Sequence, residues 1–376
     1  MRLLFWTQLY LPNIGGIEVI SHKLLLALRE RGYTVCVVTG HGNLNLPDED
    51  EYEGIPVHRF PFYQALVTRD AALMLQTQRR LGKLKEQFRP DIVHVNFSDP
   101  SVLFHLRTQG AGRSRLVVTF HITMSAELSG PETLLGTMLR SADWVTTVSA
   151  IQLAELRRAV PEVARSSSLI YYGLEPPTEP PVPPPQAPRL LCVGRLVAEK
   201  GVDVAIAAFA SLADRFPTAR LVIAGDGPVR AELQQQARSL GIADRTDFLG
   251  WVAPEEVLAL MRGASVVLMP SRWKLDAVPL VMLQAALVAR AVVATRVGGV
   301  AEFVVDGKTG ILVDAEDCVG LARALAFMLE RPDAPARMGS AARVRVLEMF
   351  GWERYVDEYD HLYRRLVTQE VYAGSR

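Results

Sequence analysis

The stretch from Met269 to Val313 reads MPSRWKLDAVPLVMLQAALVARAVVATRVGGVAEFVVDGKTGILV and contains the pattern that decides the fold. A short apolar run predicts a strand, and a polar loop carrying Asp276 follows it. Pro279 is expected at the first position of a helix that holds Gln284, because that position needs no N–H donor. A second apolar strand is expected from Ala291 to Thr295. Strand, helix and strand in this order indicate a βαβ unit with a parallel sheet.

The start of this helix is a candidate anion site. The first amides of a helix lack intrahelical acceptors, and here they belong to Leu280, Val281 and Met282. Exposed N–H groups at a helix start attract negative charge, most often a phosphate. We therefore interpret Leu280 and Val281 as residues that bind a phosphorylated ligand through their backbone.

Size and composition favour a two-domain protein of the cytoplasm. The chain has 376 residues, of which 49% are hydrophobic and 22% charged, as in ordinary globular proteins. Its 41 basic and 41 acidic residues cancel, so the overall charge does not favour a nucleic-acid partner. No apolar run reaches membrane-spanning length, and the first residues, MRLLFWTQLYLP, have too short an apolar core for a signal peptide.

The three cysteines indicate neither a metal site nor a disulfide framework. Cys36, Cys192 and Cys318 are odd in number and far apart, and no CxxC spacing occurs. We expect reduced thiols and no metal.

The first half opens with a strand, a glycine-containing loop and a helix. Leu3 to Thr7 predicts the strand, and apolar residues from Ile17 recur at helical spacing. Between them, Gly15 and Gly16 would let a ligand approach the backbone at a helix start, since no Cβ blocks it. A tight turn without a ligand is the other interpretation.

His121 is a candidate site residue because of its place after a strand. Asp91 to Asn96 and Arg115 to Phe120 read as buried strands, and His121 ends the second. Open α/β sheets bind ligands beyond the carboxyl ends of their strands. A histidine that caps a strand end in solvent is the alternative.

A basic helix end offers two interpretations. The helix expected from Ala71 to Phe88 ends in QRRLGKLKEQFR, which predicts a solvated face. The alternative is a patch that contacts anionic lipid, so that the protein would sit peripherally at the inner membrane face.

A proline-rich run marks the domain boundary. The sequence PPTEPPVPPPQAP, residues 176–188, favours extended polyproline geometry and predicts a linker. We expect a first domain over residues 1–175 and a second over 189–350. Residues 352–372 predict a last amphipathic helix.

The second half restarts the βα alternation and supplies two cations in one loop. Arg195 and Lys200 follow the strand expected from Leu190 to Val193. Two fixed cations at a strand's carboxyl end suit a pyrophosphate. The alternative is a solvated loop in which Lys200 forms a weak surface pair with Glu199.

The opening stretch resembles the signature of the retaining GT-B glycosyltransferases of family 4. That signature has two acids separated by seven residues around a helix start. Asp276 and Gln284 keep the spacing, but Asp is one methylene shorter than Glu and Gln is uncharged. The other matching positions are Gly298, Gly299, Glu302, the DGKTG run at 306–310, and the GR....KG pattern around Arg195 and Lys200.

The resemblance implies an α/β chain of two Rossmann-like, doubly wound parallel-sheet domains with a cleft between them. It also implies that the C-terminal helix crosses back to complete the first domain. The implied reaction moves a sugar from a nucleotide diphosphate, UDP by default, to a hydroxyl acceptor with retained configuration. Polysaccharide, glycolipid or glycoside synthesis would use such a step. The nucleotide sugar is a co-substrate, and neither a cofactor nor a metal is implied.

The resemblance also assigns roles to single residues. His121 would contact the transferred sugar, Asp276 its hydroxyls, and Gln284 the ribose. Arg195 and Lys200 would hold the pyrophosphate. The remaining donor-binding positions are Gly15, Gly16, Gly225, Val252, Leu280 and Val281.

The altered acids leave two other functions open. One is a catalytically weak GT-B partner subunit that binds nucleotide without transferring sugar. The other is a nucleotide-sugar epimerase of the same fold, which needs acid and base groups flanking the sugar ring.

Overall fold

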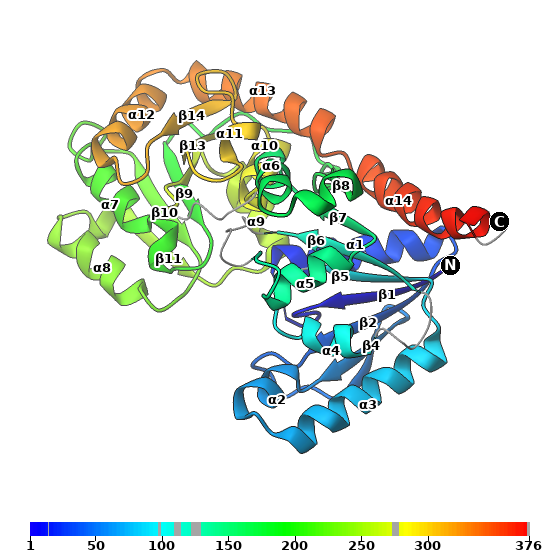
Figure 1. Cartoon of the computed structure of the whole chain (residues 1–376). Helices are drawn as coiled ribbons and strands as arrows, with labels where there is room; N and C mark the ends of the chain where they lie inside the picture. The colour runs from blue at the N-terminus through cyan, green and yellow to red at the C-terminus, as the bar shows by residue number, and fades with distance from the viewer. Residues whose placement is uncertain (14, 97–98, 109–113, 122–128, 273–277, 374–376) are drawn as a thin grey trace. The chain divides into compact units, whose positions relative to one another are not determined.

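The chain forms two compact α/β units in a computed structural model (Figure 1). The structure describes residues 1–13, 15–96, 99–108, 114–121, 129–272 and 278–373. One unit consists of Met1–Gly173 together with Trp352–Arg376, and the other of Leu174–Gly351. The first unit is therefore discontinuous in sequence.

The first unit is built on one sheet, which in the described residues has eight strands in the order β3-β4-β2-β1-β5-β6-β7-β8. All pairs are parallel except β3 with β4, which is antiparallel. The inner strands are nearly continuous runs of buried apolar residues, as a sheet covered on both faces requires. The strands are β1 (Arg2–Thr7), β2 (Thr34–Gly40), β3 (Glu49–Tyr52), β4 (Ile55–Phe60), β5 (Ile92–Asn96), β6 (Arg115–Phe120), β7 (Trp144–Thr147) and β8 (Ser167–Leu169).

Helices flank this sheet (Figure 1). Their buried faces carry apolar side chains at helical spacing, for example on the first helix at Ile20, Leu24 and Leu28. The described helical segments are α1 (Gly16–Glu30), α2 (Phe62–Thr68), α3 (Ala71–Phe88), α4 (Val102–Arg107), α5 (Leu134–Ser141), α6 (Ala150–Ala159), the 3-10 turn η1 (Pro161–Ser166) and α14 (Trp352–Ala373).

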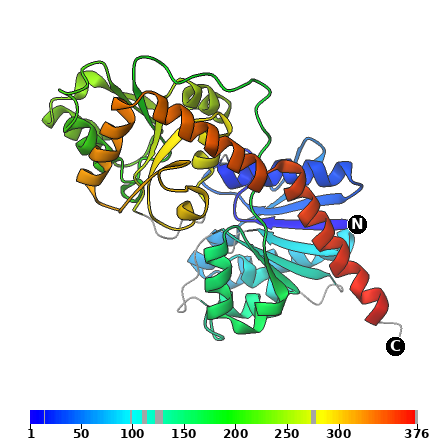
Figure 2. The ribbon, with the colours of Figure 1, turned by 90° about the horizontal axis from the view of Figure 1, so that it is seen from above.

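The C-terminal helix α14 belongs to the first unit and packs against α1 (Figures 1 and 2). The hydroxyl of Tyr363 lies 2.6 Å from Nδ1 of His94, and the hydroxyl of Tyr359 lies 3.0 Å from Oγ1 of Thr119. These four side chains are buried. The two bonds satisfy polar groups inside the core and fix the helix on the unit.

The second unit has a six-stranded parallel sheet in its described residues, in the order β11-β10-β9-β12-β13-β14. The chain adds strands on one side of β9 and then on the other, so the direction of winding reverses between β9 and β12. Such a reversal leaves a crevice at the carboxyl ends of those two strands. The strands are β9 (Arg189–Val193), β10 (Arg220–Ala224), β11 (Thr246–Gly250), β12 (Val266–Met269), β13 (Ala291–Thr295) and β14 (Gly310–Val313).

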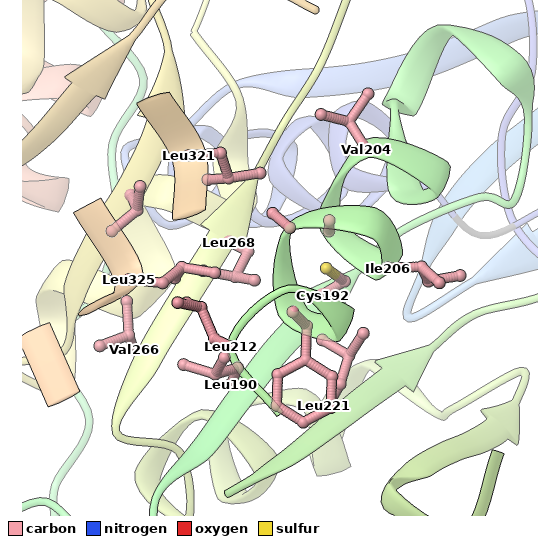
Figure 3. Close-up of a cluster of buried hydrophobic side chains, with 14 of the residues drawn as sticks. Leu190, Cys192, Val204, Ile206, Leu212, Leu221, Val266, Leu268, Leu321 and Leu325 are labelled. Carbon is pink, nitrogen blue, oxygen red and sulfur yellow. The ribbon is translucent and has the colours of Figure 1, made fainter. Parts of the chain in front are cut away.

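The core of the second unit lies between its sheet and helices. Figure 3 shows the thiol of Cys192 among leucine side chains, including Leu190 and Leu268. This thiol therefore packs as a small apolar group. The helical segments are α7 (Val202–Ala210), α8 (Arg230–Ser239), α9 (Pro254–Arg262), α10 (Leu280–Leu287), α11 (Val300–Phe303), α12 (Cys318–Glu330), α13 (Asp333–Met349) and the 3-10 turns η2 (Ala198–Lys200) and η3 (Ala243–Arg245).

Two local details correct the expectations from sequence. Helix α10 begins at Leu280, and Pro279 is the residue before it, with an extended backbone. The basic end of α3 is not wholly solvated, because Lys85 is buried. Its ammonium group lies 2.8 Å from Oγ1 of Thr108 and 3.0 Å from Nδ1 of His105. In the part of the chain that the structure describes, no helix is long and apolar enough to span a membrane.

Candidate functional site

A pocket opens at the carboxyl ends of β9 and β12, where the winding of the second sheet reverses. Two loops and the start of α10 form its walls. The lining residues are Cys192, Val193, Gly194, Arg195, Leu196, Lys200, Val202, Leu268, Met269, Pro270, Ser271, Pro279 and Val281. The structure therefore brings together three predicted site residues, Arg195, Lys200 and Val281.

The loop after β9 is held by the turn that follows β10. The N–H of Gly194 donates to the carbonyl of Ala224 over 3.0 Å, and the N–H of Leu196 donates to that of Asp226 over 2.8 Å. Gly225 lies directly behind the loop with φ +145°, and a Cβ there would be 1.8 Å from the oxygen of Gly194. Gly225 therefore supports the loop from behind and does not line the pocket.

Arg195 and Lys200 place two cations on the pocket wall. The Arg195 side chain is exposed, and among the described residues it has no ion-pair partner; Lys200 is half-buried. Glu199 meets the loop after β12 through its backbone, since its carbonyl accepts from the Ser271 hydroxyl at 3.1 Å and the Arg272 amide at 2.8 Å. The loop that carries the two cations is thus hydrogen-bonded to the loop after β12.

Arg272 is a positioning residue that sequence reasoning missed. Its guanidinium donates to both carboxylate oxygens of Asp203, over 2.7 and 2.5 Å, and to the Ala198 carbonyl over 2.7 Å. It also pairs with Glu316, with one bond of 3.0 Å. These partners raise the pKa of Arg272, and the guanidinium lowers that of Asp203. Because two carboxylates neutralise the guanidinium of Arg272, we interpret this side chain as a group that holds the loop in place and not as one that binds a phosphate. The signal in the sequence was an arginine in the loop that follows a strand end.

The start of α10 lines the pocket through Pro279 and Val281. The N–H of Met282, expected to be unpaired, donates to the carbonyl of Pro279 over 3.0 Å. Leu280 and Val281 are the remaining first-turn amides, and the helix has no side-chain cap. Gln284 is half-buried one turn further on and is not part of the lining. Asp276 lies outside the described residues.

Val252 lies away from this pocket, just after β11 at the sheet edge. It is half-buried, whereas the neighbouring Trp251 is 66% exposed. The end of β11 is joined to the turn after β10, because the N–H of Gly225 donates to the carbonyl of Gly250 over 2.7 Å.

Gly15 and Gly16 form the N-terminus of α1 in the first unit. Gly15 precedes the helix with φ −143° and ψ 174°, an extended conformation, and its carbonyl accepts from Val19 over 3.1 Å. The carboxylate of Glu18 folds back over Gly15, so that a Cβ there would lie 2.3 Å from Oε2. Burial raises the pKa of Glu18. An acid therefore covers Gly15, one of the two glycines that were predicted to let a ligand approach.

His121 is buried at the end of β6 and both of its ring nitrogens are bonded. Nε2 lies 2.9 Å from Oδ1 of Asn96, and Nδ1 lies 2.7 Å from the hydroxyl of Tyr172. An amide oxygen only accepts, so Nε2 carries the proton and Nδ1 accepts from tyrosine. Burial lowers the pKa of His121 to about 3, and the ring is therefore neutral at pH 7. It is not the exposed strand cap that formed the alternative interpretation.

Known proteins match both halves of the chain. Residues 14–178 match the family described as Glycosyltransferase Family 4, and residues 179–345 match Glycosyl transferases group 1. Glycogen synthase of Mycobacterium tuberculosis is 31% identical over 94% of this chain and 92% of its own length. The chain is a GT-B glycosyltransferase. The N-acetyl-alpha-D-glucosaminyl L-malate synthase of Bacillus anthracis is 26% identical, with 94% of each chain covered.

Solved structures share the fold of this glycosyltransferase. Sucrose-phosphate synthase from Thermosynechococcus elongatus superposes with a TM-score of 0.82 at 22% identity, over 98% of this chain and all of that one. Anabaena HepE in complex with UDP superposes with a TM-score of 0.76 at 21% identity, over 97% of this chain and all of that one. The predicted fold, two Rossmann-like parallel-sheet domains, is confirmed.

Proposed function

We propose that this glycosyltransferase moves a sugar from a nucleoside-diphosphate donor to a hydroxyl acceptor with retention of configuration. The observation that carries the proposal is the pocket at the switch point of the second sheet. There Arg195 and Lys200 line the same pocket as Val281, at the start of α10. Two cations and the start of a helix in one pocket suit a diphosphate.

In the proposed reaction, the acceptor oxygen bonds to the anomeric carbon as the bond from that carbon to the phosphate oxygen breaks. The departing phosphate takes the acceptor proton on the same face of the sugar. Negative charge accumulates on the leaving diphosphate, where Arg195, Lys200 and the amides of Leu280 and Val281 would stabilise it. Two fixed cations supply this neutralisation without a metal.

The other site residues keep their proposed roles. His121 would contact the sugar through a neutral ring, so it contributes no positive charge. Asp276 would accept hydrogen bonds from sugar hydroxyls. Gln284 would bind the ribose, and the backbone near Val252 the base.

UDP is the proposed nucleotide because HepE, which shares the fold, was crystallised with UDP and with UDP-glucose. Relatives with 28% identity over 94% of this chain are named GDP-mannose-dependent mannosyltransferases, so GDP is the competing donor to test. The acceptor is proposed only as a hydroxyl compound.

Calorimetric titration with UDP, GDP and ADP tests the nucleotide site. Arg195→Ala and Lys200→Ala should each weaken binding of the preferred nucleotide about 10-fold or more, because each removes a charged hydrogen bond. Arg323→Ala, at an exposed position of α12, is the matched control and should bind as the wild type does. Binding of no nucleotide, or equal affinities in all variants, would contradict the proposal.

A second function is favoured by Gln284, which is uncharged where the family signature has an acid. A non-catalytic partner subunit would bind the nucleotide but neither hydrolyse nor transfer its sugar. A donor-hydrolysis assay on the isolated chain separates the two functions.

A further inference from the structure

A row of buried polar side chains crosses the first unit and has His121 at its centre. The amide nitrogen of Asn96 donates to the Ser21 hydroxyl on α1 over 3.0 Å, and the amide oxygen lies 2.9 Å from Nε2 of His121. The Tyr172 hydroxyl lies 2.7 Å from Nδ1 of the same ring. The four side chains are at most 7% exposed. Each polar group therefore depends on its protein partners rather than on bulk water.

The backbone of Tyr172 is fixed by the C-terminal helix. The guanidinium of Arg354 on α14 donates to the carbonyls of Tyr171 and Tyr172, over 2.8 and 3.1 Å. Glu358, one turn further along α14, accepts from Arg354 over 2.7 Å and orients it. The planes of the Tyr172 and His121 rings are only 5° apart. The tyrosine hydroxyl is therefore presented to His121 from a defined position.

These contacts match the neutral form of His121. A neutral imidazole has one donor and one acceptor nitrogen, and here an amide oxygen faces one and a hydroxyl the other. A proton on Nδ1 would break the bond that Tyr172 donates. His94 on β5 interacts electrostatically with this ring, so a charge on one histidine disfavours a charge on the other. Burial lowers the pKa of both histidines, and both are neutral at pH 7.

We propose that Asn96 and Tyr172 are positioning residues that keep His121 in one neutral tautomer beside the transferred sugar. The inference rests on the proposed function, in which His121 contacts that sugar. As the bond from the anomeric carbon to the phosphate oxygen breaks, the sugar ring gains positive charge. An imidazolium beside it would raise the barrier by repulsion, whereas a neutral ring does not. The network thus preserves transfer at a pH where an exposed histidine would be charged.

Nitrogen-15 NMR of the His121 ring tests the tautomer without any substrate. The wild-type ring should carry its proton on Nε2 and should not titrate between about pH 5.5 and about pH 8.5. Its signals are assigned by their loss in His121→Gln. A proton on Nδ1, or titration near the ordinary histidine pKa, would overturn the proposal whether or not the chain transfers sugar.

Asn96→Asp introduces a charge while it keeps the shape of the side chain. Because a buried carboxylate favours the protonated form of the ring beside it, His121 should now become charged as the pH is lowered. The rate is measured as hydrolysis of UDP-glucose, or of GDP-mannose if GDP binds more tightly. The ratio of variant to wild-type rates should fall about 10-fold from about pH 8.5 to about pH 6. Nucleotide affinity should not change, because Asn96 does not line the nucleotide pocket.

The control for this charge is Asn45→Asp, at an exposed position of the same unit. It should give the same ratio to the wild-type rate at every pH. If the ratio for Asn96→Asp is equally constant, the charge state of His121 has no effect on the reaction and the proposal is wrong.

Tyr172→Phe tests the other nitrogen. Loss of the bond to Nδ1 should raise the pKa of His121 and slow donor hydrolysis roughly 10-fold. Tyr363→Phe is the matched control, because Tyr363 makes the same kind of bond, 2.6 Å long, to Nδ1 of His94. Both variants should lose stability, but only Tyr172→Phe should slow hydrolysis. Equal rates in the two variants would remove Tyr172 from the proposal.

The two kinds of measurement separate this inference from the proposed function. A wild-type chain that binds nucleotide but hydrolyses no donor contradicts the proposed function. In that case the NMR measurement still decides whether Asn96 and Tyr172 keep His121 neutral.

Discussion

Gly225 faces the carbonyl oxygen of Gly194 so closely that a β-carbon at position 225 would lie 1.8 Å from that oxygen. Gly225→Ala must therefore displace the loop that carries Arg195. We expect a loss of about 3 kcal/mol in the free energy of unfolding, from the overlap and the strained φ. We also expect nucleotide affinity to fall with it, as measured by urea unfolding and calorimetric titration.

The control for this change is Gly241→Ala. Gly241 also has a positive φ, +71°, but a Cβ there would meet no atom within 4 Å. It should cost about 1 kcal/mol and leave nucleotide binding intact. Equal effects of the two substitutions would show that the close approach to Gly194 affects neither stability nor nucleotide binding.

Replacing Arg272 by lysine should loosen the donor loop while keeping the charge. Lysine cannot form the paired bonds to Asp203, so we expect a stability loss of about 1–2 kcal/mol and a weaker nucleotide affinity. Arg220→Lys breaks a similar pair, with bonds of 2.9 and 2.6 Å to Asp247. That pair is not part of the pocket, so this variant should bind nucleotide normally.

Restoring an acid at position 284 tests the ribose contact. Gln284→Glu should raise affinity for the preferred nucleoside diphosphate roughly fivefold, because a carboxylate accepts stronger hydrogen bonds than an amide. The 2′,3′-dideoxy nucleotide should show no such gain. A gain for both nucleotides would place the effect elsewhere than the ribose.

Acid should destabilise the first unit before the second. Burial lowers the pKa values of His94, His105 and His121 to about 3. Below the unfolded pKa of about 6.5, the unfolded chain binds protons that the folded rings exclude. The free energy of unfolding therefore decreases as the pH is lowered, by up to about 4 kcal/mol per pH unit for three rings. Above that pH their contribution is complete.

Hydrogen exchange at pH 7.5 and 5.5 measures this effect separately in each unit. All seven histidines belong to the first unit, so the second unit serves as an internal control. Earlier loss of protection in the second unit would contradict the expectation.

Local patterns in the sequence predicted most of the strands and helices. Strand β3 is an exception, because its residues, EDEY, lack an apolar pattern. Its pairing with β4 includes a bond from the Arg59 guanidinium to the Asp50 carboxylate, which the spacing of the sequence does not indicate. The end of α10 nearest Pro279 was placed one residue early, since proline is accepted at either position.

The sequence predicted site residues that lie close together in the chain and share one loop, as Arg195 and Lys200 do. Contacts between distant residues were not predicted. Arg272 meets Asp203 from 69 residues away, and Tyr172 meets His121 from 51. Sequence spacing contains no information on such pairs, which arise only when parallel strands bring their carboxyl ends to one edge.

Helix α14 has a consequence for biosynthesis. The ribosome makes the whole of Leu174–Gly351 before it makes the segment that contributes Tyr359 and Tyr363 to the first unit. His94 and Thr119 can bond to each other early, but their bonds to α14 form only after a complete second unit has emerged from the ribosome. The unit whose translation begins first is therefore the unit whose folding is completed last.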